Sequence, residues 1–389
     1  MNKILLISLD VIDDLNHQPL FKDFCDCLNT IIEEKNAVGF VSRLPSRVKE
    51  AKEKYGGINK SYHFITRQKA KKMIKEHGKS YFIFLGNRDV DFYTAVNAKM
   101  LFLIPTWVRE TDYKARRYGL EIDNSKELLE IVRTANNQNF WYAYKELEDG
   151  SIVMSLMDGA YRAYSKSDTE RILIKKFEEV LKQGNRNTFF EILLYHFLSA
   201  ISNDNTLFSD VTIWGIFPSS TNKLNSEMLH FKETVREMMK CQEPRNLDIH
   251  NKNVLLRHTP VKKSQHTKGN IRYKDGSDKH LNSIYVNPKF KKKLKNATVC
   301  IFDDFLNYGN SFETARNLLK KAGAKKVIFV ALGKFRKPYI YQDYDIEGDV
   351  TTDYFNFELI NRYDISHLSF EINDEAKNEV ENLHKIFNL

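Results

Sequence analysis

The chain of 389 residues has little cysteine and no long apolar run. Its four cysteines are irregularly spaced and form neither a zinc pattern nor a disulfide framework. No stretch reaches the roughly 18 consecutive apolar residues that a membrane span needs. The opening segment MNKILLISLD is short and ends in an acid, so it is predicted to be a first strand and not a signal peptide. These absences favour a reducing, cytoplasmic setting and no membrane partner.

The chain does have many apolar residues and an excess of positive charge. Apolar residues make up 42% of the total, enough for the cores of two domains at roughly 100–200 residues each. The net charge of +9 is compatible with nucleic acid, with a membrane surface or with anionic small molecules as partners. The Lys and Arg residues are scattered, with local density at 262–272 and 289–295. We expect a phosphate-rich small ligand, with nucleic acid as a less favoured alternative.

Strand and helix patterns alternate at both ends of the chain, which predicts an α/β fold with two doubly wound parallel sheets. We expect a first domain at 1–112, a mainly helical connector at 113–208 and a second domain at 209–389. The strands expected in the first domain are Ile4–Leu9, Val38–Ser42, Tyr81–Leu85 and Met100–Pro105. The helices expected in the connector are Ser125–Thr134, Asp168–Lys182 and Asn187–Ser202. The strands expected in the second domain are Val211–Phe217, Val254–Leu256, Ser283–Val286, Ala297–Phe302 and Val327–Leu332.

The sharpest motif is FDDFLNYGNS at 302–311, in which an apolar strand leads into two aspartates and a glycine turn. Ligands of open α/β sheets bind at the carboxyl ends of the strands, where Asp303 and Asp304 stand. The helix that follows offers unpaired N–H groups and a positive dipole end, which suit a phosphate. Gly309 permits close backbone approach, and Ser311 can cap the helix and donate its hydroxyl to a phosphate oxygen.

The two aspartates are expected to bind a different part of the ligand from the helix N-terminus. Like charges repel, so carboxylates do not face a phosphate, but they accept hydrogen bonds from two neighbouring sugar hydroxyls. A phosphate at one end and a diol at the other describe a ribose 5-phosphate group.

This segment resembles the nucleotide-binding signature of type I phosphoribosyltransferases. The resemblance implies that Asp303 and Asp304 bind the 2- and 3-hydroxyls of phosphoribosyl pyrophosphate (PRPP). It further implies that the 5-phosphate is bound by Asn307, Tyr308, Gly309, Asn310 and Ser311. This chain has Asn307-Tyr308 where the family usually has two threonines, so an amide and a phenol replace two hydroxyl donors.

Two upstream segments extend the resemblance, which covers about a third of the chain. WGIFPSST at 214–221 resembles the loop that supports the pyrophosphate, with Ser219 and Ser220 as its ligands. Residues 255–286 resemble the mobile catalytic loop of the ComF-type branch, with matching residues at Arg257, Thr259, Gln265, Arg272 and Asn282. The cations that would neutralise departing pyrophosphate are Arg257, Lys262, Lys263 and Arg272. The resemblance implies transfer of a phosphoribosyl group to or from a base, with Mg²⁺ held largely by the sugar hydroxyls and the pyrophosphate.

Polar residues also follow the strands of the first domain. Asp10, Ser42 and the segment GNRDVD at 86–91 come after three of them, and Lys69, Lys71 and Lys72 lie on a helix between. This order resembles the haloacid dehalogenase-like (HAD) phosphohydrolases. The resemblance implies that Asp10 is the nucleophile and that Ser42 binds the phosphoryl group. It assigns Mg²⁺ to Asp10, Asp89 and Asp91.

Two departures separate this domain from the HAD pattern. Ile12 stands where the family has its general acid/base, and Asn87 replaces the aspartate of the expected Gly-Asp pair. The domain is therefore either an open phosphatase or a degenerate one that binds a phosphoryl ligand or a partner. For the whole chain the alternatives are a non-catalytic sensor or effector of a nucleotide or PRPP, as in stress or phage-defence loci, and a nucleic-acid-binding protein. The acceptor base and the oligomeric state stay open.

Overall fold

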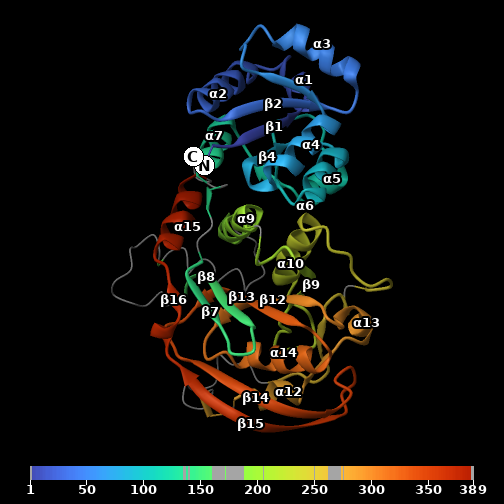
Figure 1. Cartoon of the computed structure of the whole chain (residues 1–389), viewed down its shortest axis with the longest axis vertical. Coiled ribbons are helices and arrows are strands. Elements are labelled where there is room, and N and C mark those ends of the chain that lie inside the picture. The colour runs from blue at the N-terminus through green and yellow to red at the C-terminus, as the bar shows by residue number, and fades with distance from the viewer. Residues whose placement is uncertain are drawn as a thin grey trace.

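Two β-sheets flanked by helices organise the chain into an upper and a lower lobe (Figure 1). The computed structural model describes residues 2–134, 137–138, 141–159, 171, 188–204, 206–248, 250–261, 273–274 and 276–386. The upper lobe comprises residues 2–134, and the lower lobe comprises the described residues from 141 onward. The α/β class predicted from the sequence is confirmed in both lobes. No helix among the described residues is long and apolar enough to cross a membrane.

The upper lobe is built on six parallel strands, here called sheet A, in the order β3-β2-β1-β4-β5-β6. They are β1 (Ile4–Ser8), β2 (Ala37–Ser42), β3 (His63–Thr66), β4 (Phe82–Leu85), β5 (Leu101–Pro105) and β6 (Leu120–Ile122). The helices are α1 (Leu9–Leu15), α2 (Phe21–Glu33), α3 (Pro45–Tyr55), α4 (Arg67–His77), α5 (Asp89–Asn97), α6 (Tyr113–Tyr118) and α7 (Ser125–Arg133), with the 3₁₀ turn η1 (Lys79–Tyr81). Strand β1 lies between β2 and β4, so the chain reverses its direction of winding there. Open α/β sheets bind ligands at such a point.

The lower lobe is built on sheet B, whose strand order is β16-β7-β8-β13-β12-β9. Its strands are β7 (Ala143–Glu146), β8 (Ile152–Asp158), β9 (Val211–Ile216), β12 (Thr298–Leu306), β13 (Lys326–Lys334) and β16 (Glu371–Ile372). Strands β8, β13, β12 and β9 are parallel, but β7 and β16 run antiparallel to their neighbours. Sheet B is therefore mixed, which corrects the expectation of a wholly parallel second sheet.

Strand β12 is longer than expected and contains the two aspartates. Its register with β13 runs from Thr298 to Leu306, so Asp303 pairs with Ala331 inside the ladder. The extension has an apolar cause, because Leu306 is buried and the ring of Phe305 stacks on Phe335 at a centroid distance of 5.2 Å. The acids stand near the carboxyl edge of the sheet, but on a strand that continues past them.

Two small antiparallel sheets complete the lower lobe. One joins β10 (Leu255–Arg257) to β11 (Ile284–Val286), so the strand expected near 254–256 lies outside sheet B. The other is a hairpin of β14 (Tyr339–Gly348) and β15 (Phe355–Ile365), which lies beside α14 at the bottom of Figure 1. The helices of this lobe are α9 (Thr188–Asn203), α10 (Ser226–Met238), α12 (Asp278–Leu281), α13 (Lys291–Leu294), α14 (Asn310–Lys321) and α15 (Glu375–Ile386), with the turns η4 (Pro288–Phe290) and η5 (His367–Ser369).

The segment 113–208, expected from the sequence to be a mainly helical connector, contains α6, α7 and α9 together with three strands in its described part. It supplies α6, β6 and α7 to the upper lobe, and β7 and β8 to sheet B. The helix expected at Asp168–Lys182 lies outside the described residues except for Arg171. The domain boundaries themselves remain a prediction.

Helix α9 packs between the lobes and joins them by polar contacts at its carboxyl end. The ammonium group of Lys3 donates to the carbonyl of Ser80 at 2.7 Å and to Asn203 Oδ1 at 3.2 Å. The Nζ of Lys79 donates to the carbonyl of Ile201 at 2.7 Å. Lysine charge is favourable at a helix C-terminus, so sheet A and α9 are held together there.

Candidate functional site

The carboxyl edge of sheet B brings the two halves of the FDDFLNYGNS motif together. Asp303 and Asp304 are half-buried. Asp303 accepts a hydrogen bond from the backbone N–H of Asp304 at 2.9 Å, and the side chain of Ser311 in the first turn of α14 is near enough to influence its pKa. The strand that carries the acids and the helix that follows them therefore meet at one point.

The electrostatics of Asp303 are unusual for a surface carboxyl. Burial raises its pKa well above the usual range, and the charge of Asp304 adds to this, while the Ser311 hydroxyl acts in the opposite direction. Burial also lowers the pKa of Arg257 to about 10, against the opposing effect of Asp303. Arg257 is thus within electrostatic reach of the acids, but no described residue forms an ion pair with Asp303.

The turn before α14 requires glycine for two reasons. Gly309 has φ of +88°, in the left-handed region that side chains disfavour. A Cβ at this position would also lie 2.4 Å from Cε2 of Tyr339, which no rotamer change of a buried ring relieves. The first intrahelical bond is from Glu313 N–H to the Gly309 carbonyl at 2.9 Å. The amides that precede Glu313 have no intrahelical acceptor and point out of the helix end.

The other residues predicted to bind the phosphate differ in whether their side chains already have hydrogen-bond partners. The Oδ1 atom of Asn307 is buried and has no hydrogen-bond partner among the described residues. The carbonyl of Tyr308 accepts from Ile340 N at 2.8 Å, and its ring lies edge-on to Tyr273 at 5.8 Å. The Oδ1 atom of Asn310 accepts from the side chain of Gln342 at 2.9 Å. The side chain of Asn310 is therefore engaged within the protein, and the helix N-terminus beside it is the feature that suits a phosphate.

Arg257 fastens the upstream loop. Its guanidinium donates to the carbonyl of Ser219 at 2.6 Å and to that of Pro218 at 3.4 Å, and it also donates to the hydroxyl of Ser283. Ser220 accepts the N–H of Val261 at 2.9 Å on its carbonyl. Arg257 is buried, so the structure gives it a positioning contact with the 218–220 loop. Lys262, Lys263 and Arg272 lie outside the described residues.

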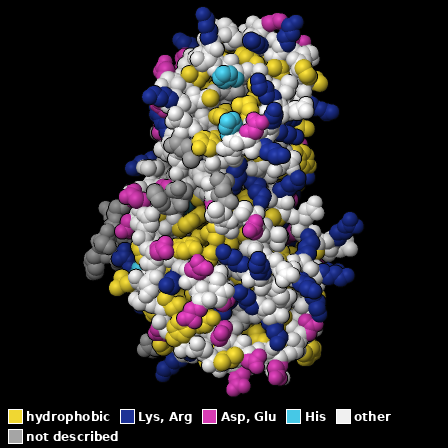
Figure 2. Space-filling model, in the orientation of Figure 1, with side chains coloured by type: hydrophobic (Ala, Val, Ile, Leu, Met, Phe, Trp, Pro, Cys, Tyr) yellow, Lys and Arg dark blue, Asp and Glu magenta, His cyan; other side chains and the backbone are white. Residues whose placement is uncertain are grey.

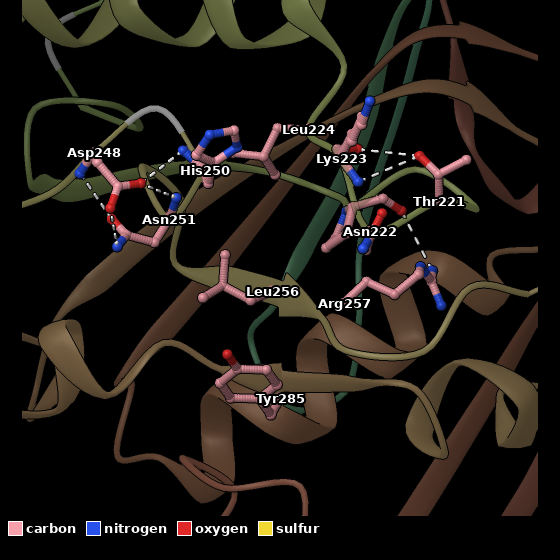
Figure 3. A pocket seen from close by; sticks show the side chains of 11 residues that line it. Thr221, Asn222, Lys223, Leu224, Asp248, His250, Asn251, Leu256, Arg257 and Tyr285 are labelled. Carbon is pink, nitrogen blue, oxygen red and sulfur yellow. Dashed lines mark hydrogen bonds between the residues drawn. The ribbon is translucent and has the colours of Figure 1, made fainter.

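A cavity of about 190 Å³ lies beside this loop (Figure 3). The residues that line it are Pro218, Thr221, Asn222, Lys223, Leu224, Asp248, His250, Asn251, Leu256, Arg257 and Tyr285. It shares Arg257 with the acidic site but excludes Asp303, Asp304 and the 307–311 turn. Sequence reasoning missed Lys223, His250 and Tyr285, because they come from three separate segments that only the fold brings together.

The residues on which the HAD resemblance rests lie at the carboxyl edge of sheet A. Two of them, Asp10 and Asp91, form ion pairs with arginines. Asp10 lies in the first turn of α1, and Arg47 of α3 binds it at 2.9 Å while also binding Asp13 at 2.6 Å. Ser42 ends β2, is buried and accepts the N–H of Leu44 at 3.4 Å. Ile12 is fully buried, so its position carries no polar group toward the site.

The two acids of the GNRDVD segment point to different partners. Asp91 is buried and paired with Arg67 of α4, and burial raises its pKa to about 6 despite this arginine. Asp89 Oδ1 instead accepts the backbone N–H groups of Lys114 and Ala115, at 2.8 and 3.1 Å, and so caps α6.

The carboxylates therefore do not fit a Mg²⁺ ion bound by Asp10, Asp89 and Asp91. Within the described residues, no three His, Cys, Asp or Glu side chains are grouped so as to hold a metal ion. The cations that reach the acids are Arg47 and Arg67, whereas Lys69, Lys71 and Lys72 are exposed. Arg67 could have been expected at this edge only from its position directly after β3, and β3 was not among the predicted strands.

The two sheets, one parallel and one mixed, define an α/β protein. No protein-family model matches the chain, and no curated protein is similar to it. Among solved structures, UMP synthase from Leishmania donovani aligns with 85% of this chain and 85% of its own chain. The sequence identity is 10% and the TM-score is 0.20, a level at which neither fold nor function is carried over.

Proposed function

We propose that the lower lobe binds a phosphorylated ribose, such as PRPP or a nucleotide, and transfers the phosphoribosyl group to or from a base. The observation that carries this proposal is the position of Asp303 and Asp304 on β12, directly before the left-handed Gly309 turn and the N-terminus of α14. Such a position suits acceptors for a sugar diol and amide donors for a phosphate ester at the edge of one sheet.

The chemistry follows from this arrangement. Asp303 and Asp304 accept hydrogen bonds from the sugar hydroxyls, and the amides at the start of α14 cradle the 5-phosphate. Departure of pyrophosphate leaves an oxocarbenium-like centre at the anomeric carbon, which the base attacks. Arg257 holds the 218–220 loop by a hydrogen bond to the carbonyl of Ser219. The resemblance to phosphoribosyltransferases implies that this loop binds the pyrophosphate. Mg²⁺, when bound to the pyrophosphate and the sugar hydroxyls, would neutralise the anion, and it needs few protein ligands.

Titration calorimetry with PRPP and Mg²⁺ tests the proposal. The wild-type protein binds, and the Asp303→Asn/Asp304→Asn variant loses binding while keeping its fold. A matched control is Asp345→Asn/Glu347→Gln, which removes the same charge from the exposed face of β14 and leaves affinity unchanged. Equal affinity of wild type and the Asp303/Asp304 variant would show that the acids do not bind the sugar. A screen of nucleobases then identifies the acceptor.

We infer that the upper lobe is a phosphoryl-binding domain without hydrolytic turnover. The absence of a polar group at Ile12 removes a proton-transfer contribution of about 10²–10⁴-fold, and Arg47 occupies Asp10. The test is hydrolysis of a panel of phosphate esters with Mg²⁺, for wild type and for Arg47→Gln. We expect no turnover from either protein. Turnover that disappears in Asp10→Asn would instead establish an active phosphatase.

A further inference from the structure

One part of the upper lobe carries a large excess of positive charge, besides the local densities at 262–272 and 289–295. Residues 43–75 contain eleven Lys and Arg residues and two acids, a net charge of +9. The whole chain also has a net charge of +9, so the rest of the sequence is balanced. This segment forms α3, β3 and α4, and both helices pack on the edge strand β3. We call it the basic face.

Most of these cations are exposed and weakly neutralised. The exposed ones are Arg43, Lys49, Lys52, Lys54, Lys60, Lys69, Lys71, Lys72 and Lys75. Among the described contacts of these nine, the one ion pair is Lys72 with Glu76 at 3.7 Å. Figure 2 shows Lys and Arg side chains spread over the upper lobe, with few acids among them.

The first turn of α4 carries cations against the helix dipole, whereas Lys52, Lys54 and Lys75 lie in last turns, where cations are favourable. Arg67 and Lys69 lie in the first turn of α4, where the helix dipole disfavours cations. Lys75 lies one turn after Lys71 and Lys72, and like charges at these spacings destabilise a helix. A polyanion bound to this face would relieve both repulsions.

The basic face runs into the edge of sheet A. Ser42 and Thr66 are register partners at the ends of β2 and β3, and Arg43 and Arg67 follow them directly. Arg47 and Arg67 then reach Asp10 and Asp91. The exposed lysines therefore lie next to an edge of sheet A at which Arg47 and Arg67 are already paired with acids.

The apolar residues of the two helices decide which polyanion fits. A helix that docks on a membrane keeps an apolar face for the lipid. Here the apolar positions Ala51, Tyr55, Ala70 and Ile74 are buried in the lobe, and Val48 and Met73 are half-buried. Leu44 and Ile58, which flank α3, are exposed, but α3 and α4 themselves present charge and not an insertable face. A chain of phosphodiesters needs cations spread over a surface and no apolar contact.

We propose that the basic face binds the sugar–phosphate backbone of a nucleic acid. This inference concerns residues 43–75 and does not depend on PRPP binding by the lower lobe. Binding is independent of sequence, because lysines that contact phosphates do not read bases. It also weakens steeply with salt, because each contact releases counterions.

Fluorescence polarisation of labelled 20-nucleotide RNA, single-stranded DNA and duplex DNA with the full chain tests this proposal. The test variant is Lys69→Gln/Lys71→Gln/Lys72→Gln/Lys75→Gln. The control, with the same loss of charge on the lower lobe, is Lys289→Gln/Lys292→Gln/Lys321→Gln/Lys325→Gln. We expect at least 10-fold weaker binding for the test variant and less than a 2-fold change for the control. The slope of log K against log salt should fall by roughly 3 for a single strand, at roughly 0.7 per phosphate contact.

Several results would overturn the proposal. One is that the wild-type protein binds none of the three nucleic acids at 50 mM salt. Another is that the control variant loses as much affinity as the test variant. A third is cosedimentation with phosphatidylserine vesicles without nucleic-acid binding, which would make the face a membrane-docking surface. If the test variant does not fold, Lys49→Gln/Lys52→Gln/Lys54→Gln on α3 replaces it with the same expected loss. Asp303→Asn/Asp304→Asn keeps nucleic-acid binding, which separates this surface from the ribose site.

Discussion

The acids at the edges of the two sheets have opposite environments. In the upper lobe Asp10 and Asp91 are paired with arginines, and Asp89 caps a helix. In the lower lobe Asp303 accepts a neighbouring amide and lies near the Ser311 side chain, without an ion pair to a described residue. A carboxylate that is already neutralised has little left for a ligand, whereas one held by neutral donors keeps acceptor capacity. Two sheet edges with similar sequence patterns can therefore differ in how many carboxylate acceptors they leave for a ligand.

The largest test of this comparison is Arg67→Gln. It leaves the buried carboxyl of Asp91, whose pKa burial already raises to about 6, without its cation. Removing one partner of a buried pair costs about 3 kcal/mol or more at pH 8, because the remaining charge is desolvated without compensation. Chemical denaturation of wild type and variant measures this loss. The double variant Arg67→Gln/Asp91→Asn should recover part of it, and no recovery would mean that Asp91 is not the group that Arg67 stabilises.

The next test is Gly309→Ala, which adds a side chain where the turn needs none. The positive φ costs roughly 1–2 kcal/mol, and contact with the Tyr339 ring adds an overpacking cost of roughly 1–3 kcal/mol. Gly150→Ala is the matched control, because Gly150 has φ of +76° but no atom within 4 Å of the added Cβ. Thermal unfolding of both variants separates strain from contact. Equal losses would contradict the packing of Tyr339 on the turn.

Sequence reasoning succeeded where local pattern and buried contact agree. Strands such as β1 and β13 are uninterrupted apolar runs, and α14 has its apolar residues on one face with Gly323 after it.

What sequence reasoning missed depends on partners far along the chain. The hairpin β14–β15 is rich in polar residues, and its fold depends on contacts such as Gln342 with Asn310. Strand β8 was not predicted, although it pairs with β13 across more than 170 residues. The pairs of Arg47 with Asp10 and of Arg67 with Asp91 likewise arise from tertiary packing, so no spacing rule indicates them.

The smallest effect is expected from Asp303→Asn, and its sign is opposite to that of Arg67→Gln. Because the pKa of Asp303 is raised in the folded state, the protonated form is the one that folding favours. The resulting stability is complete below the usual aspartate pKa of about 4 and is lost as pH rises toward the folded pKa. Asparagine mimics the protonated group at every pH, so the variant should match wild type at pH 4 and exceed it at pH 8. A gain on the order of 1 kcal/mol would raise Tm by roughly 2–4 °C.

Thermal unfolding of wild type and variant at pH 4 and pH 8 measures the difference. The control Asp345→Asn changes an exposed carboxyl and should show no such pH-dependent gain. A variant that gains stability while losing PRPP affinity would mark Asp303 as a residue kept for binding at a cost in stability. A variant less stable than wild type at pH 8 would mean that a cation compensates Asp303 as Arg67 compensates Asp91, and the contrast between the two edges would disappear.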